Sequence, residues 1–216
     1  MNISPEIIEK IVREVVSQSS GNSVTDDTAP IGISNRHIHL TKEDVETLFG
    51  KGYELQKLKD LSQPGQFACK ETLTIVGPSM RPIEKVRVLG PERSKTQIEI
   101  SRTDSYTLKV KAPVRESGKV EGSAGLTIIG PKGIVTVDEG CIIANRHIHM
   151  SPDDGARFGL KDCDYVTVDL LGERKTRFYD VQIRVHKDFR LEMHIDTDDA
   201  NAAGVKNGDK AIIIKD

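Results

Sequence analysis

The sequence contains one short motif, Asn-Arg-His-Ile-His, at residues 35–39 and again at residues 145–149. Four of the six histidines lie in these two copies. In an extended strand, side chains two positions apart point to the same side, so the two histidines of each copy are expected to project together. Paired neutral imidazoles supply two of the three or four ligands of a catalytic zinc site, so the duplication predicts metal binding. The four predicted ligands are His37, His39, His147 and His149.

A third ligand for each site must come from elsewhere in the chain. His194 is the best candidate, because it shares one face of an alternating segment, residues 191–196, with Asp196. Glu99 is its rough counterpart in the first half, in a strand whose other face is apolar. His186 stands in a predicted turn between charged residues and is expected to be solvated. The three widely spaced cysteines could ligate metal, but buried thiols of a reduced protein are the simpler interpretation.

Three arginines stand close to these candidate ligands. Arg36 and Arg146 adjoin the histidines, but neighbouring residues of a strand face opposite ways, so a purely structural role is open for both. Arg93 lies in a turn that enters the Glu99 strand, where it either binds phosphate through its planar fork or is a solvated surface charge. The chain has no Walker loop, dinucleotide motif or nucleophile elbow, so arginine and metal would have to hold a phosphate-bearing ligand.

Composition narrows the classes of partner. The net charge of −2 and the absence of tryptophan argue against nucleic acid. No apolar run approaches the ~20 residues that a membrane span needs, and the N-terminus lacks the apolar core of a secretion signal. We therefore expect an intracellular protein without a nucleic-acid or membrane partner.

The first residues stand apart from the rest. Apolar side chains recur at helical spacing over residues 4–16, with Ser4 as N-cap and Pro5 in the first turn. Residues 17–30, rich in Ser, Thr, Asp and Gly, indicate a flexible linker. So short an amphipathic helix is marginal alone. It is expected either to dock on a partner protein or to pack on its own domain or a sister subunit of a homo-oligomer.

From residue 31 the apolar pattern alternates with period two. It predicts short strands with frequent Gly-Pro turns, and a brief helix after each histidine motif, as at residues 41–49. Such strands are typical of barrels or sandwiches. The repeated motif predicts two related domains, residues 31–120 and 121–216, that a pseudo-twofold arrangement would bring together. Weaker echoes relate Arg87 to Arg184 and Glu99 to Glu192.

Longer motifs accompany the duplicated one, at residues 61–66, 89–94, 99–104 and 191–198. With them, the sequence from about residue 31 onward resembles the PduL-type phosphate propanoyltransferases. The resemblance implies a mainly β fold of two β-barrel domains with short helices. It also implies exchange of phosphate with coenzyme A on short acyl groups, propanoyl or acetyl, and two zinc ions per chain. One zinc would be held by His37, His39 and Glu99, the other by His147, His149 and His194, and Arg93 would bind phosphate.

The resemblance also bears on location and mechanism. Relatives that work in bacterial microcompartments, as in propanediol degradation, often carry a short N-terminal helix for encapsulation, and residues 4–16 resemble it. Otherwise the cytoplasm is expected. No residue stands out as a covalent nucleophile, so direct attack of phosphate on the thioester is favoured. The alternatives are a dinuclear metal hydrolase and a metal-storage or sensor module with saturated ligands.

Overall fold

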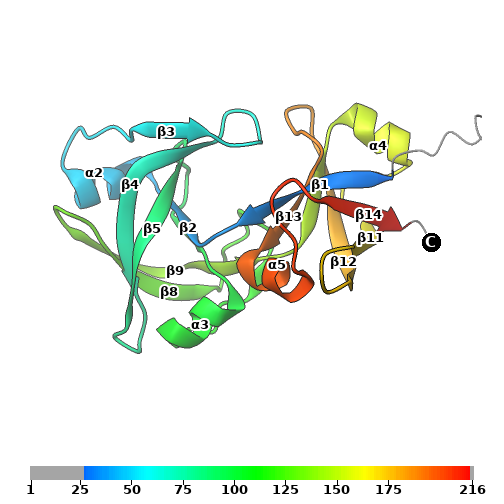
Figure 1. The fold of residues 1–216 in the computed structure, drawn as a ribbon. Helices are drawn as coiled ribbons and strands as arrows, with labels where there is room; N and C mark the ends of the chain where they lie inside the picture. Colours follow the sequence, from blue (N-terminus) through cyan, green and yellow to red (C-terminus); the bar gives the residue numbers. More distant parts are fainter. Residues whose placement is uncertain (1–26, 215–216) are drawn as a thin grey trace, which may run out of the picture.

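The computed structural model describes residues 27–214 (Figure 1). The helix expected at residues 4–16 lies outside the described residues. The linker expected at residues 17–30 overlaps strand β1, which begins at Thr28 and runs to Ser34. Ala29 is fully buried and pairs with Ala211, so these residues are part of a core. Pro30 obscured this strand in the sequence, because proline is uncommon inside strands.

The strands form two closed barrels (Figure 1). In the first barrel, hydrogen-bonded neighbours follow the order β4-β5-β2-β6-β9-β8, and β8 closes the ring on β4. Its strands are β2 (His37–His39), β4 (Phe67–Val76), β5 (Pro82–Gly90), β6 (Gln97–Glu99), β8 (Ala124–Ile129) and β9 (Ile134–Ala144). Two short strands, β3 (Lys57–Asp60) and β7 (Val114–Arg115), pair with β4 and β9.

The second barrel follows the order β1-β13-β10-β12-β11-β14 and closes from β14 back to β1. Its further strands are β10 (His147–Met150), β11 (Tyr165–Leu170), β12 (Thr176–Val185), β13 (Glu192–Asp196) and β14 (Lys210–Ile214). The parallel and antiparallel pairings come in the same order in both rings, so β2 corresponds to β10 and β6 to β13. The mainly β fold of two related barrels is therefore confirmed.

The strand before each histidine motif belongs to the other half of the molecule. Strand β1 precedes the first motif but pairs with β13 and β14 of the second barrel. Strand β9 precedes the second motif but pairs with β6 and β8 of the first barrel. The sheets therefore do not divide near residue 120, where the repeat placed the boundary. Duplication in a sequence reveals related halves, but not which copy of a strand completes which barrel.

Four short helices cap the barrels in the described part of the chain. As expected, α2 (Lys42–Phe49) and α4 (Pro152–Phe158) follow the two motifs, behind the N-caps Thr41 and Ser151. Helices α3 (Arg102–Leu108) and α5 (Thr197–Ala203) follow β6 and β13. No helix within residues 27–214 has the length and apolar character needed to cross a membrane.

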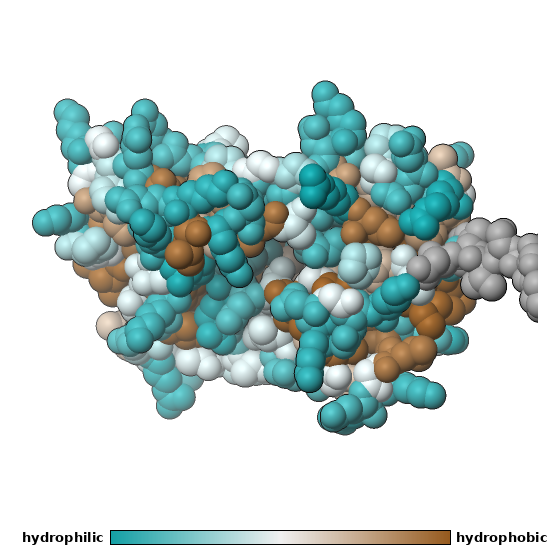
Figure 2. Space-filling model, turned by 45° about the horizontal axis from the view of Figure 1, so that its top comes forward, coloured by the Kyte–Doolittle hydropathy of each residue, from teal (hydrophilic) through white to brown (hydrophobic). Residues whose placement is uncertain are grey.

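Each motif contributes its isoleucine to a barrel core. Ile38 and Ile148 are fully buried, one in each of the two apolar clusters. Because side chains alternate along a strand, the histidines on either side must point away from the cores. His37 and His147 line a pocket between the barrels. The space-filling view shows a hollow between the two halves of the molecule (Figure 2).

Candidate active site

The first group of candidate ligands comes from two antiparallel strands. His37 in β2 lies directly opposite Glu99 in β6, and its Nε2 is 3.4 Å from a Glu99 carboxylate oxygen. The other ring nitrogen of His37, Nδ1, donates to the carbonyl of Asn35 at 2.8 Å. This hydrogen bond leaves Nε2 to face the carboxylate, where a proton or a metal ion can lie between them. With His39, these side chains are buried and offer ligand atoms within 4.8 Å of one another.

The second group repeats the arrangement with three histidines. His147 in β10 lies opposite His194 in β13, and its Nδ1 donates to the carbonyl of Asn145 at 2.9 Å. The Nδ1 of His149 is 3.1 Å from Nε2 of His194. All three offer ligand atoms within 4.8 Å. The strand registers thus make His194 the counterpart of Glu99.

The same registers correct both weaker echoes. Glu192 lies opposite His149, the place that Gln97 takes opposite His39 in the first barrel, so Glu192 is not the counterpart of Glu99. Arg184 lies opposite His149, whereas Arg87 lies opposite His37. The echoes matched short apolar patterns that repeat every two residues, and such patterns align equally well two positions out of register.

Two histidines of the second triad are held neutral. Burial, with the neighbouring charge of His194, lowers the pKa of His147 to about 3 and the pKa of His149 to about 2. At neutral pH both imidazoles therefore carry a free lone pair, which is the form that binds metal.

The first triad contains an ion pair. Burial disfavours charge on His37, but the carboxylate of Glu99 outweighs burial and raises the pKa of His37. Burial also opposes ionisation of Glu99, yet His37 holds its pKa well below the ordinary value. The pKa of His39 is lowered well below 6.5, by burial first and then by the charge of His37.

Both triads fit a divalent metal. Each contains a buried ring nitrogen without a hydrogen-bond partner among the described residues, Nδ1 of His39 and Nε2 of His149. Such a nitrogen is costly to bury unless an ion or proton donor meets it. Nitrogen and carboxylate donors in threes suit zinc, with a position left open for substrate. One pocket, lined by His37, Glu99, His147 and His194 among others, joins the triads.

Arg36 and Arg146 serve the structure beside these ligands. Arg36 grips Asp104 with two contacts of 2.8 Å, and Arg146 grips Asp199 in the same way. Each carboxylate stands at the start of the helix that follows the third-ligand strand. Each arginine therefore links the segment that crosses between the barrels to a helix. This agrees with the structural role that alternation along the strand left open for both.

Arg93 lies next to the first triad. It is half-buried, and its Nη1 donates to the hydroxyl of Ser117 at 3.3 Å. That hydroxyl donates in turn to Glu99 at 2.8 Å. Burial lowers the pKa of Arg93, while the charge of Glu99 opposes the shift. The interpretation of Arg93 as a solvated surface charge is therefore wrong.

Comparison with known proteins points to one family. The family model described as phosphate propanoyltransferase matches residues 30–206. The chain is 53% identical over 209 residues to the phosphate propanoyltransferase of Lachnoclostridium phytofermentans, which covers 97% of both chains. It is 57% identical over 186 residues to that of Thermotoga maritima, covering 86% of this chain and 88% of the relative.

The chain belongs to the phosphate propanoyltransferase family. The resemblance seen in the sequence is thereby confirmed, and so is the expectation of an enzyme that transfers acyl groups. Membership implies acyl-CoA and phosphate as substrates. Which residues bind them is a separate question that the geometry above addresses.

Two contacts around the triads of this phosphate propanoyltransferase were not predicted from its sequence. Glu192 lies 3.1 Å from Nε2 of His194 and accepts hydrogen bonds from Ser62 and Gln63, in a loop that reaches over from the first barrel. At the equivalent place Gln97 donates to Glu99 at 2.6 Å. The signal was present, because each residue stands two positions before the third ligand and on its face.

Proposed function

We propose that the chain is a zinc-dependent phosphate acyltransferase. It would interconvert propanoyl-CoA, or acetyl-CoA, and phosphate with acyl phosphate and coenzyme A. The observation that carries the proposal is the pair of three-ligand groups that face one pocket, with half-buried Arg93 hydrogen-bonded next to the first. One ion would be held by His37, His39 and Glu99, and the other by His147, His149 and His194.

The reaction balances without a covalent intermediate on the enzyme. A phosphate oxygen forms a bond to the acyl carbon, the carbon–sulfur bond breaks, and the electron pair leaves with the coenzyme A thiolate. Bound zinc would supply Lewis acidity for the carbonyl and a soft partner for sulfur. Arg93 would bind and orient phosphate through its planar fork, and its partly buried setting strengthens that interaction.

The function is tested by following thiol release from propanoyl-CoA with and without phosphate. We expect release only with phosphate, together with about two zinc ions per chain by elemental analysis. A dinuclear hydrolase would release thiol without phosphate, and a storage module would release none. Acetyl-CoA in a parallel assay measures the acyl preference.

The role of Arg93 is tested by substitution. Arg93→Ala should raise the KM for phosphate and slow turnover by roughly 10- to 100-fold, because a charge-assisted contact to substrate is lost. Arg93→Lys should restore only part of the activity, because lysine lacks the bidentate fork. Wild-type kinetics in phosphate for Arg93→Ala would show that this role is wrong.

Location is a second part of the proposal. We expect residues 4–16 to dock on a shell or core protein of a bacterial microcompartment and to add nothing to the chemistry. Deletion of residues 1–20 should leave acyl transfer intact and abolish co-localisation with the compartment. A lower melting temperature or a changed oligomeric state, with targeting intact, would instead show that the helix packs on its own domain or a sister subunit.

A further inference from the structure

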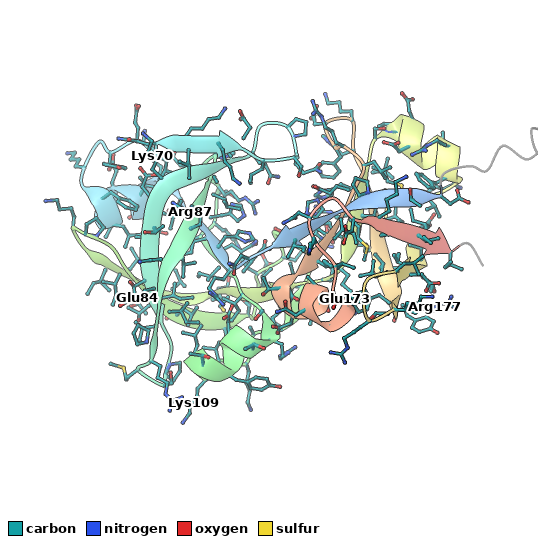
Figure 3. The ribbon with its side chains drawn as sticks, in the orientation of Figure 1. Lys70, Glu84, Arg87, Lys109, Glu173 and Arg177 are labelled. Carbon is teal, nitrogen blue, oxygen red and sulfur yellow. The ribbon has the colours of Figure 1, made fainter. Side chains whose placement is uncertain are left out.

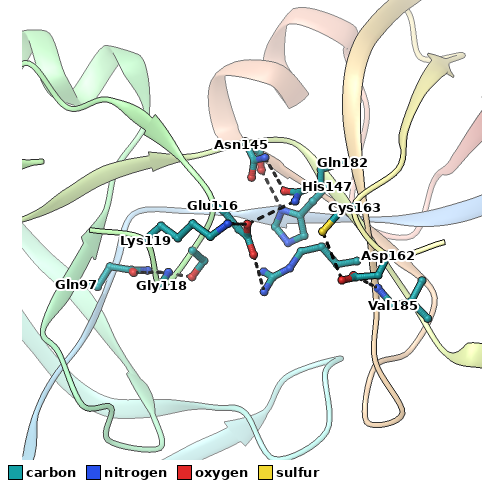
Figure 4. A network of polar contacts seen from close by, with 12 residues as sticks. Gln97, Glu116, Gly118, Lys119, Asn145, His147, Asp162, Cys163, Gln182 and Val185 are labelled. Atoms are coloured by element: carbon teal, nitrogen blue, oxygen red, sulfur yellow. Dashed lines mark hydrogen bonds and ion pairs between the residues drawn. The ribbon is translucent and has the colours of Figure 1, made fainter. Parts of the chain in front are cut away.

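A strap of six residues, 114–119, lies over the site and meets both barrels. At its centre, two consecutive residues contact two arginines. Ser117 accepts a hydrogen bond from Arg93 of the first barrel at 3.3 Å. Glu116 lies 3.5 Å from a guanidinium nitrogen of Arg184, in β12 of the second barrel. The close view shows Glu116 between the two barrels, at the centre of a polar network (Figure 4).

Arg184 lies on the same face of its barrel as the second triad. It is paired with His149 across β10 and β12, while its neighbour Ile183 is fully buried in the core. The Arg184 guanidinium stands 5.7 Å from the ring centre of Phe189, and that ring stacks on His149 at 4.0 Å. Only 22% of the Arg184 side chain is exposed. A half-buried cation thus stands next to a metal-binding group.

Arg184 also interacts electrostatically with the other charged groups of the site. After burial and the neighbouring histidines, its charge helps to lower the pKa of His147 and His149. Besides burial, it also helps to lower the pKa of Arg93, and the partners of the two guanidiniums, Ser117 and Glu116, are consecutive residues. Two cations at short range in a partly buried place repel each other unless an anion lies between or beside them.

The internal partner of Arg184 is a weak one. A single contact of 3.5 Å is beyond the usual range of an N–H···O hydrogen bond. Glu116 is shared with Lys119 at 2.7 Å and with Gln182 at 3.5 Å. Arg36 and Arg146, by contrast, grip their carboxylates with two contacts of 2.8 Å each. The planar fork of Arg184 is therefore left largely available for a second oxyanion.

We propose that Arg184 is a second phosphate-binding residue, which acts with Arg93 from the opposite barrel, and that Glu116 is the internal carboxylate that neutralises Arg184 until a phosphate oxyanion replaces it. This inference rests on the proposed function, since it names a further substrate contact at the same site. An oxyanion held by one arginine of each barrel would also hold the two triads at a set distance from each other.

The phosphate group in question has two possible sources, inorganic phosphate and the phosphates of coenzyme A. The contacts of Arg93 and Arg184 to the consecutive residues Ser117 and Glu116 favour inorganic phosphate, because a single tetrahedral oxyanion can accept from both forks. Separate KM values for phosphate and for acyl-CoA distinguish the two sources.

The experiment compares zinc-loaded wild type with four variants, Arg184→Ala, Arg184→Lys, Glu116→Gln and Arg177→Ala. Arg177 is the matched control, because it lies on the same strand, pairs with Asp169 and points away from the site at the outer end of the barrel (Figure 3). Melting temperatures of all proteins are measured alongside. Wild-type thiol release must first require phosphate. If it does not, the proposed function fails, independently of Arg184.

We expect Arg184→Ala to raise the KM for phosphate roughly 10- to 100-fold, with a smaller change in kcat and in the KM for acyl-CoA. Arg184→Lys should recover part of the loss. Glu116→Gln should lower the KM for phosphate, because the competing carboxylate is gone, whereas Arg177→Ala should change nothing. If residues 114–119 have a purely structural role, Arg184→Ala and Glu116→Gln should both raise the KM for phosphate. That result, an unchanged KM for phosphate in Arg184→Ala, or a rise confined to acyl-CoA, would overturn the proposal.

Discussion

The two triads occupy equivalent places in equivalent barrels, yet the carboxylate stands in different positions. In the first barrel Glu99 is itself a candidate ligand, supported by the amide of Gln97. In the second barrel His194 takes the ligand position, and the carboxylate, Glu192, lies behind it. One exchange along the strand thus moves a negative charge from a candidate ligand position to the surroundings of the candidate metal site.

This difference predicts two unequal metals. A divalent ion at the first triad would lose part of its charge to Glu99, whereas three neutral imidazoles at the second would leave the ion more electrophilic. Arg93, which we propose to bind phosphate, reaches Glu99 through Ser117, so the first site lies closest to it. A duplicated fold can therefore assign different tasks to its halves by changing two positions in one strand.

The strongest test of the comparison removes one ligand from each half. His37→Ala and His147→Ala should each reduce activity by about a hundredfold or more, because metal chemistry at either site is lost. Elemental analysis should find about two zinc ions in the wild type and about one in each variant. Loss of all metal from both variants would mean that the triads share a single site.

A weaker change separates the surroundings of the two ligands. Glu192→Gln should reduce zinc affinity at the second triad by roughly 10- to 100-fold, since a partner of a metal-binding histidine sets its orientation and basicity. Gln97→Ala should cost less at the first triad, because the ligand there already carries the charge. Competition with a chromogenic chelator measures both. Equal losses would show that the position of the carboxylate does not matter.

Substitution of Arg36 and Arg146, which lie in the segments that cross between the barrels, tests how much each ion pair contributes to stability. Arg36→Ala leaves Asp104, only 4% exposed, without its cation, whereas Arg146→Ala leaves the more accessible Asp199. We expect a loss of about 2–3 kcal/mol in the free energy of unfolding for the first and roughly half of that for the second. Urea titration of zinc-loaded protein provides the values. A larger loss for Arg146→Ala would contradict the ranking by burial.

Much of the site follows from local alternation in the sequence. His37 and His39 point together because Ile38 must enter a core, and the same holds for His147 and His149 around Ile148. Glu99 and His194 were placed by the same reasoning about strand faces, and the registers put each opposite a motif histidine. That these residues bind zinc stays a prediction.

What the sequence could not predict depends on pairing between distant strands. The exchange of β1 and β9 between barrels is decided by burial on partners far away in the chain, such as Ala29 against Ala211. Arg184 was passed over because an exposed-looking arginine in an alternating strand has no local sign of its neighbours. Its place next to His149 appears only once β12 is paired with β10.

The smallest expected effect is a difference in acid sensitivity between the triads without metal. His147 has a folded pKa of about 3 against an ordinary value of 6.5, so between these values the unfolded chain binds more protons. Its contribution to stability is therefore present above pH 6.5 and is lost as the pH falls. His37 has a raised pKa, so its contribution grows as the pH falls through the folded pKa towards 6.5.

Zinc-free wild type should thus lose stability between pH 7 and pH 5, and the two histidines should act in opposite directions. Replacing His147 by Gln should reduce that loss by about 1–2 kcal/mol, because a group that resists protonation in the folded state is gone. Replacing His37 by Gln should enlarge it by a smaller amount, because a stabilising protonation is gone. Urea unfolding of the three chelator-treated proteins at both pH values gives the comparison. Titrating groups that interact with neither histidine are common to all three proteins and cancel in the differences. If both variants shift the acid-induced loss in the same direction, a neutral His147 and an ion-paired His37 are not the states that distinguish the two barrels.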